Sequence, residues 1–113
     1  HENFKNEIVK AKEGDTMLTL KDVTPVRLIK NQFFNKINTA IINGANIEEQ
    51  RKILGRGRAK KGMFEGDLIE GELEIGQVSG LIDSIEPVET IIKNIINEYN
   101  VALKELEKSK YTF

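Results

Sequence analysis

The sequence predicts a mainly helical fold with one or two short strands, an α+β arrangement within 113 residues. Three observations support this prediction. Apolar residues recur at helical spacing in several segments, most clearly over residues 88–106. Two short β-prone segments, 16–20 and 25–31, separate the earlier helical segments. Five glycines fall within residues 62–81, where regular structure must be interrupted because glycine is unfavourable inside helices and strands.

The first predicted helix covers residues 2–12. Phe4, Ile8 and Ala11 fall on one face of it, with charged residues opposite, and Gly14 is expected to end the helix.

Two extended segments and a second helix are expected next. Residues 16–20 are β-prone, and Pro25 opens a second extended segment in which apolar residues alternate with Arg27. Residues 32–43 carry apolar side chains at near-helical spacing, and the Asn-Gly pair that ends at Gly44 terminates this helix.

The middle of the chain predicts shorter elements. Residues 47–54 are expected to form a short helix, and a short basic helix is expected after the Gly-Arg-Gly-Arg sequence at 55–58, reaching Phe64. The glycine-rich residues 66–71 predict a turn, and residues 73–81 are expected to re-enter a helix.

The last predicted helix is the clearest. Ile85 lies near its start and Pro87 is expected at its first position, where the missing N–H has no cost. The helix runs to about residue 108, and residues 108–113 are expected to form a frayed tail. Its wide aliphatic stripe would cover more apolar surface than the other short elements supply. The stripe consists of Val88, Ile91, Ile92, Ile95, Ile96, Tyr99, Leu103 and Leu106.

Composition excludes several classes of function. With 17 basic and 18 acidic residues, the chain has neither the charge of a nucleic-acid-binding protein nor a polybasic membrane patch. The absence of cysteine excludes disulfides, thiol catalysis and thiolate metal sites, and fits a cytoplasmic protein. No apolar run reaches the roughly 20 residues of a membrane span, and no signal peptide is recognisable. Because the chain starts at His1 and enters a helical pattern at once, we expect a piece of a longer protein rather than a simply processed start.

Two groups of candidate residues have an ordinary structural interpretation that is favoured. His1 could act as a base or ligand, but a solvent-facing position at a helix start is the better interpretation. Arg56 and Arg58, with Lys60 and Lys61 nearby, could bind phosphate, yet they match no phosphate-loop motif. A solvated basic face is therefore expected.

The acidic residues give a third candidate group. Carboxylates in pairs can act as acid and base or hold a hard cation. The stretch lacks a calcium-loop pattern, so a surface acidic turn is expected, and Gln77 by periodicity is an ordinary helix residue. The stretch consists of Glu65, Asp67, Glu70, Glu72 and Glu74. From the residues alone, no catalytic set and no metal site is complete.

Four stretches nevertheless resemble a known family, over about residues 1–106. Residues 62–81 are similar to its Gly-Asp…Gly…Gly-Gln…Gly-Leu motif, with the same spacing. Residues 1–12, residues 15–31 with Pro-Val-Arg-Leu-Ile-Lys-Asn, and residues 85–96 are similar to its flanking segments. The sequence thus resembles the C-terminal third of the FMN-dependent enoyl-acyl-carrier-protein reductase II and nitronate monooxygenase (2-nitropropane dioxygenase) family.

The resemblance implies a place in a (β/α)₈ TIM-barrel flavoenzyme, with FMN at the C-terminal face of the strands. This chain would supply the lid beside that face, residues 1–71, and the closing helices of the barrel, residues 72–113. The apolar stripe would then pack on the upstream barrel portion of the same protein. The family's catalytic histidine and main FMN contacts lie in that portion, so no catalytic residue is assigned here and the fragment alone is expected to be inactive.

The implied function is that of an NAD(P)H-dependent oxidoreductase of fatty-acid biosynthesis, a cytoplasmic flavoprotein that reduces an enoyl thioester carried on acyl-carrier protein. The resemblance also admits a homodimer. Gly76 and Gln77 match the motif and are implied to lie near the FMN. At the implied substrate side the family has Ser-x-Met, whereas this chain has Glu72-Leu-Glu74. These carboxylates would change the electrostatics and the choice of substrate.

Two alternatives remain open, the first because of these departures and the second because of the apolar stripe. One is a nitronate monooxygenase-type flavin oxidase, or another flavin oxidoreductase with a different substrate. The other is a free-standing helical interaction module without enzymatic activity, whose stripe at 88–106 would bind a partner helix.

Overall fold

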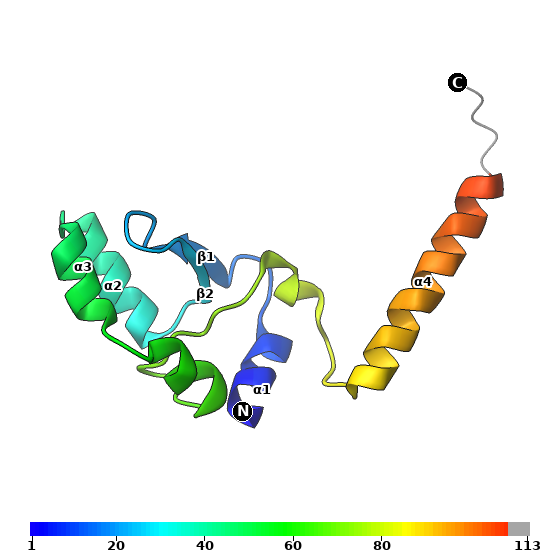
Figure 1. The fold of residues 1–113 in the computed structure, drawn as a ribbon, viewed down its shortest axis with the longest axis horizontal. Helices are drawn as coiled ribbons and strands as arrows, with labels where there is room; N and C mark the ends of the chain where they lie inside the picture. Colours follow the sequence, from blue (N-terminus) through cyan, green and yellow to red (C-terminus); the bar gives the residue numbers. More distant parts are fainter. Residues whose placement is uncertain (109–113) are drawn as a thin grey trace, which may run out of the picture.

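A computed structural model describes residues 1–108, in an elongated arrangement with extents of 56 × 37 × 20 Å (Figure 1). In chain order the elements are α1 (Glu2–Lys10), β1 (Thr16–Thr19), β2 (Val26–Ile29), α2 (Gln32–Ile42), α3 (Ile47–Leu54), a π-helix (Lys60–Phe64), a 3-10 helix (Gln77–Leu81) and α4 (Val88–Lys108). The predicted fold class, mainly helical with two short strands, is confirmed. Lys108, where the frayed tail was predicted to begin, is the last residue of α4, and the rest of that tail, residues 109–113, lies outside the described residues.

The two strands pair antiparallel, from Thr16 opposite Ile29 to Thr19 opposite Val26. The connection between them is tight: Leu20 adopts a φ of 53°, and the backbone N–H groups of residues 23 and 24 both donate to its carbonyl at 3.0 Å. This turn brings the side chain of Leu20 back over the core, where it is buried.

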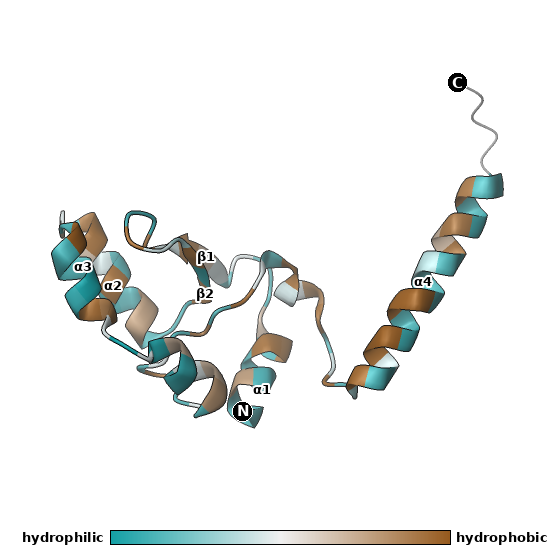
Figure 2. Cartoon of the chain, viewed as in Figure 1, coloured by the Kyte–Doolittle hydropathy of each residue, from teal (hydrophilic) through white to brown (hydrophobic). Residues whose placement is uncertain are grey.

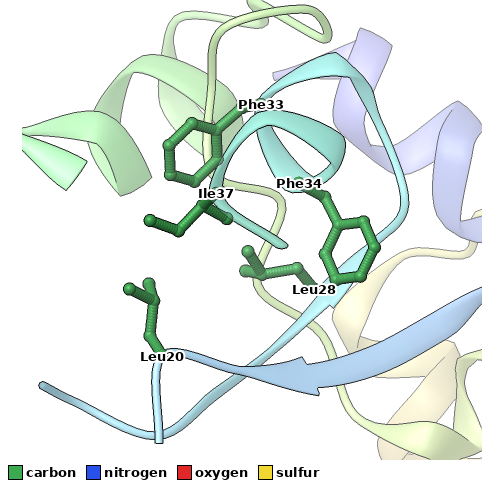
Figure 3. Packing of buried hydrophobic residues seen from close by; sticks show 5 residues of the cluster. All are labelled: Leu20, Leu28, Phe33, Phe34 and Ile37. Atoms are coloured by element: carbon green, nitrogen blue, oxygen red, sulfur yellow. The ribbon is translucent and has the colours of Figure 1, made fainter. Parts of the chain in front are cut away.

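The hydrophobic core lies between this hairpin and α2 (Figure 3). Its buried side chains are Leu20, Leu28, Phe33, Phe34 and Ile37. Burying side chains of this size stabilises the folded state by about 1.5–3 kcal/mol each. The near-helical spacing predicted for residues 32–43 is therefore confirmed, because positions 33, 34 and 37 form the buried face of α2.

The first helix ends earlier than predicted. It stops at Lys10, Ala11 is extended, and Gly14 (φ +88°) lies in a separate turn. The competing structure is local: the Asp15 carboxylate accepts a 2.8 Å hydrogen bond from the N–H of Lys12, and the N–H of Asp15 donates to the Lys12 carbonyl. Residues 12–15 thus form a closed turn instead of another helical turn.

The predicted helix over residues 73–81 is wrong. Residues 72–76 are extended alongside β2, where the Ile29 N–H donates to the Leu73 carbonyl and the Ile75 N–H donates to the Arg27 carbonyl. Only Gln77–Leu81 is helical, as a 3-10 turn. The free edge of β2 satisfies the backbone groups that a helix would have paired internally.

The predicted short basic helix that reaches Phe64 is present, but it is not a regular α-helix throughout. Gly55 (φ +69°) ends α3 and Gly57 (φ +70°) continues the turn, so helical structure restarts only at Arg58. It then widens into the π-helix Lys60–Phe64, marked by the bond from the Glu65 N–H to the Lys60 carbonyl. Single π-turns of this kind are rare and are often found at functional sites.

The long C-terminal helix α4 begins at Val88, so Pro87 directly precedes it rather than occupying its first position. Figure 1 shows α4 standing apart from the rest of the chain, and Figure 2 shows its apolar and polar residues on separate faces. None of its residues is buried. No helix within residues 1–108 combines the length and apolarity that crossing a membrane requires.

Candidate functional site

The four residues predicted to lie near the cofactor and substrate all fall on one short segment, residues 72–77. Glu72 and Glu74 lie on its extended part beside β2, while Gly76 and Gln77 are exposed at the start of the 3-10 helix. What fixes this segment therefore determines the geometry of the candidate site.

A turn at Asp67 lies directly before this segment. Its carboxylate accepts hydrogen bonds from the N–H groups of Ile69 (3.0 Å) and Glu70 (2.8 Å), and it forms an ion pair with Lys61 at 3.1 Å. The bond from Glu70, followed by those from Lys61 and Ile69, lowers the pKa of Asp67 to about 2. The turn predicted for residues 66–71 is thus confirmed and carries a stably ionised carboxylate.

Asn31 ties the same turn to α2. Its Oδ1 accepts from the Phe34 N–H at 2.8 Å, which caps the helix. Its Nδ2 donates to the carbonyls of Leu68 and Gly71, both at 2.9 Å. One side chain therefore fixes both the start of a core helix and the residue that precedes Glu72.

Arg58 makes the densest polar contacts of the region. Its guanidinium donates to the carbonyls of Leu54 (2.6 Å), Ile53 (3.1 Å) and Glu70 (2.7 Å), and also to the Glu70 carboxylate (3.0 Å). The guanidinium carbon lies 4.4 Å from the centroid of the Phe33 ring. With its side chain only 18% exposed, Arg58 contradicts the predicted solvated basic face.

The rest of the basic cluster behaves as predicted. Arg56 is exposed, and the two lysines pair with acidic neighbours, Lys60 with Glu65 at 3.5 Å and Lys61 with Asp67 at 3.1 Å. The structure thus brings these cations to local carboxylates rather than to a shared anion site.

Close backbone contacts explain two glycines of the 62–81 run. A Cβ at Gly62 would lie 2.5 Å from the Glu72 carbonyl oxygen and 2.9 Å from its nitrogen. A Cβ at Gly71 would collide with the backbone of Gly62 and of Asp67. The π-helix and the candidate segment can therefore approach each other only because both positions lack a side chain.

The remaining glycines of the run divide into two kinds. Gly66 has a φ of +78° and packs against the His1 ring, and a Cβ at Gly80 would lie 3.3 Å from the backbone of Lys12 and Glu13. Gly76 differs from all of these, because its φ is an ordinary −77° and a Cβ there would meet nothing within 4 Å. Nothing within the described residues requires glycine at this position.

Glu72 is buried, with only 7% of its surface exposed, so the prediction of a surface acidic turn is wrong for this residue. Burial raises the pKa of Glu72, the neighbouring Glu74 charge raises it further, and the Arg58 charge opposes both. The structure thus places two carboxylates on the extended segment, with the charge of Arg58 near enough to act on the pKa of Glu72.

His1 lies where the favoured interpretation puts it. It is exposed and caps α1, where its Nδ1 accepts from the Asn3 N–H at 3.1 Å. Within residues 1–108 no three acidic, histidine or cysteine side chains come together in a way that could hold a metal ion.

Sequence reasoning missed the roles of Asn31 and Arg58. Asn31 directly precedes a helical pattern, which is the signal of an N-cap, but its bonds to Leu68 and Gly71 span 37 and 40 residues and leave no local trace. Arg58 lies in a Gly-Arg-Gly-Arg sequence that reads as a surface loop.

A scan against protein-family profiles finds no match, and a search of curated proteins finds none either. Solved structures do match. FabK from Thermotoga maritima superposes with a TM-score of 0.83 at 34% sequence identity, over 96% of this chain and 34% of FabK. A methionine-to-alanine variant of the same protein matches with a TM-score of 0.74 at 31% identity, over 96% of this chain and 31% of that one.

The chain thus spans about a third of the length of the FabK structures it matches. Similarity in both fold and sequence covers 96% of this chain. The resemblance drawn from the sequence is therefore confirmed: this chain has the fold of a C-terminal part of FabK, the enoyl-acyl-carrier-protein reductase II.

Proposed function

We propose that this chain is the C-terminal portion of an FMN-dependent oxidoreductase, an enoyl-acyl-carrier-protein reductase that uses NADH or NADPH. The similarity to FabK supports this proposal. In such an enzyme FMN supplies the hydride chemistry, and the protein binds, orients and shields the reacting groups. Acyl-carrier-protein thioester is the proposed substrate, and the cytoplasm is the proposed location.

The observation that carries the proposal is the open space at Gly76. Its neighbours in the glycine run are explained by close backbone contacts or a positive φ, whereas Gly76 has neither. Because no contact within the described residues requires glycine at position 76, the absence of a side chain there fits a group from outside these residues that lies close to the backbone. We propose that this group is FMN and that the exposed Gln77 lies beside it, where its amide could donate a hydrogen bond.

The unpartnered surface of α4 supports the same proposal. Residues 81–98 enclose an open groove of about 370 Å³, lined in part by Leu81, Ile82, Ile91 and Ile95. Exposed apolar side chains continue along α4 at Ile91, Ile92, Ile95, Ile96, Tyr99 and Leu103. A continuous exposed apolar face of this kind marks an interaction site. We propose that the upstream barrel portion of the same protein covers it, with residues 1–71 as the lid and residues 72–113 as the closing helices.

Glu72 and Glu74 are proposed to lie on the substrate side. Two carboxylates there would repel an anionic substrate and leave a neutral enoyl thioester unaffected. Because nitronates are anions, the same charges would oppose nitronate binding. This contrast makes the nitronate monooxygenase alternative separable by experiment.

The test uses the whole protein, with FMN affinity and NAD(P)H-dependent reduction of an enoyl thioester as readouts. Gly76→Ala and Gly76→Val should weaken FMN binding progressively, because each added side chain occupies the proposed approach. Thr39→Val, which adds a methyl group in place of a hydroxyl on the exposed side of α2, is the control and should leave FMN binding unchanged. Turnover of a nitronate without enoyl reduction would favour the alternative oxidase, and a protein that binds no FMN would overturn the proposal.

A further inference from the structure

We propose that Arg58 is a positioning residue of this site: it holds the segment from Glu70 to Glu74 against α3 and thereby fixes Glu72 on the substrate side. The inference rests on the proposed function for its consequence in catalysis. Its structural part stands on contacts within the described residues.

Arg58 joins the end of α3 to the turn that precedes the candidate segment. On one side it donates to the carbonyls of Ile53 and Leu54 in the last turn of α3, which have no partner within a helix. On the other side it donates to both the carbonyl and the carboxylate of Glu70. The guanidinium is therefore a bridge between the end of a lid helix and the start of the candidate segment.

The guanidinium also contacts an aromatic ring of the core. It lies over the Phe33 ring, which is fully buried in the core. This cation–π contact and the hydrogen bonds together restrain the side chain of Arg58. The bridge is thus anchored on the hydrophobic core.

Glu72 is linked to Arg58 in two ways. Its backbone N–H donates to the Arg58 carbonyl at 3.0 Å, so the two residues are tied directly through their main chains. Burial and the Glu74 charge raise the pKa of Glu72. The Arg58 charge lowers it and so favours the ionised form. Arg58 thereby affects both where this carboxylate lies and how much of it is ionised.

Lysine cannot replace these contacts. An ammonium group has three donors on one atom and no planar face, whereas the guanidinium makes four hydrogen bonds from three nitrogens and stacks on a ring. Arg58→Lys therefore keeps the charge and loses the geometry. Arg56→Lys is the matched control, because Arg56 is an exposed arginine two residues away.

The experiment compares these two variants in the whole protein. Hydrogen exchange of residues 70–75 reports on positioning without any need for FMN. Steady-state kinetics with an enoyl thioester report on its consequence. We expect faster exchange in Arg58→Lys but not in Arg56→Lys, together with a loss in kcat/KM of roughly ten- to a hundredfold, as for other misplaced active-site groups.

Glu72→Gln decides whether Arg58 acts through Glu72. If it does, the kcat/KM loss from Arg58→Lys will be smaller in a Glu72→Gln background than in the wild type. Faster exchange with unchanged kcat/KM would overturn the proposal and leave Arg58 a purely structural residue. Unchanged exchange would overturn it as well. If the wild type neither binds FMN nor reduces the thioester, the proposed function fails, while the exchange result still decides whether Arg58 holds the segment.

Discussion

The guanidinium carbon of Arg58 lies 4.4 Å from the centroid of the Phe33 ring, and the Phe33 N–H donates to the carbonyl of Ile69 at 3.0 Å. A single core residue thus contacts Arg58 through its ring and the turn that precedes the candidate segment through its backbone. The hydrophobic core and the 66–77 segment are therefore directly connected, and we expect substitutions in one to affect the other.

The two asparagine helix caps should differ in their contribution to stability. Asn46→Ala removes a capping box at an exposed helix start and should lower the free energy of unfolding by about 1 kcal/mol. Asn31→Ala removes a cap and two further hydrogen bonds to residues 68 and 71, so about 2–4 kcal/mol is expected. Urea unfolding of both variants of the whole protein provides the measurement, and equal losses would contradict the bridging role of Asn31.

Gly62→Ala should destabilise the protein, because its new Cβ would lie 2.5 Å from a backbone oxygen of Glu72. Overpacking of this kind costs about 1–3 kcal/mol. Gly76→Ala, with open space and a normal φ, should stay within about 0.5 kcal/mol of the wild type when measured without FMN. Thermal unfolding of the FMN-free protein distinguishes the two, and similar effects would contradict the close approach of residues 62 and 72.

Asp67 should contribute to acid unfolding. Hydrogen bonds from Glu70, Lys61 and Ile69 hold its pKa at about 2 in the folded state, below the value of about 3.9 of the unfolded chain. Its contribution to stability is therefore present above pH 4 and is lost as the pH falls toward 2. Asp67→Asn should melt at a lower temperature than the wild type near neutral pH. The difference between the two melting temperatures should shrink as the pH falls from 4 to 2. A difference that stays constant over this range would contradict the assignment.

Glu72 should have the opposite dependence. Its pKa is raised by burial and by Glu74, so ionising it in the folded state costs stability. The cost is absent at low pH, where the carboxyl is protonated in both the folded and the unfolded state. It is fully present at a pH above the pKa of the folded state. Glu72→Gln should therefore melt at a higher temperature than the wild type at pH 7, and the gain should disappear in acid. A lower melting temperature at pH 7 would show that the Arg58 charge outweighs burial.

Local patterns were enough to predict most of the elements. The apolar spacing of residues 32–43 and 88–106 and the alternation around Arg27 correspond to α2, α4 and β2. The prediction failed at residues 73–81, because the extended form there depends on hydrogen bonds to β2, more than 40 residues away. A sequence window carries no signal for such a distant edge.

The candidate site was predictable only in part. The glycine motif marked the segment in which the candidate site is proposed, and the structure explains Gly62 and Gly71 by their mutual approach. The burial of Glu72 and the bridge made by Arg58 depend on which backbones meet in the fold. Charged residues are usually exposed, so the sequence favoured a solvated interpretation for both. The assignments of Glu72 and Glu74 to the substrate side, and of Gly76 and Gln77 to the cofactor, remain predictions.

The central claim is that this chain forms part of a flavin site. The visible absorption spectrum of the whole purified protein tests it most directly. We expect two flavin bands that are released as free FMN on denaturation. A colourless protein that also fails to take up added FMN would contradict the claim and would favour the alternative of a helical interaction module.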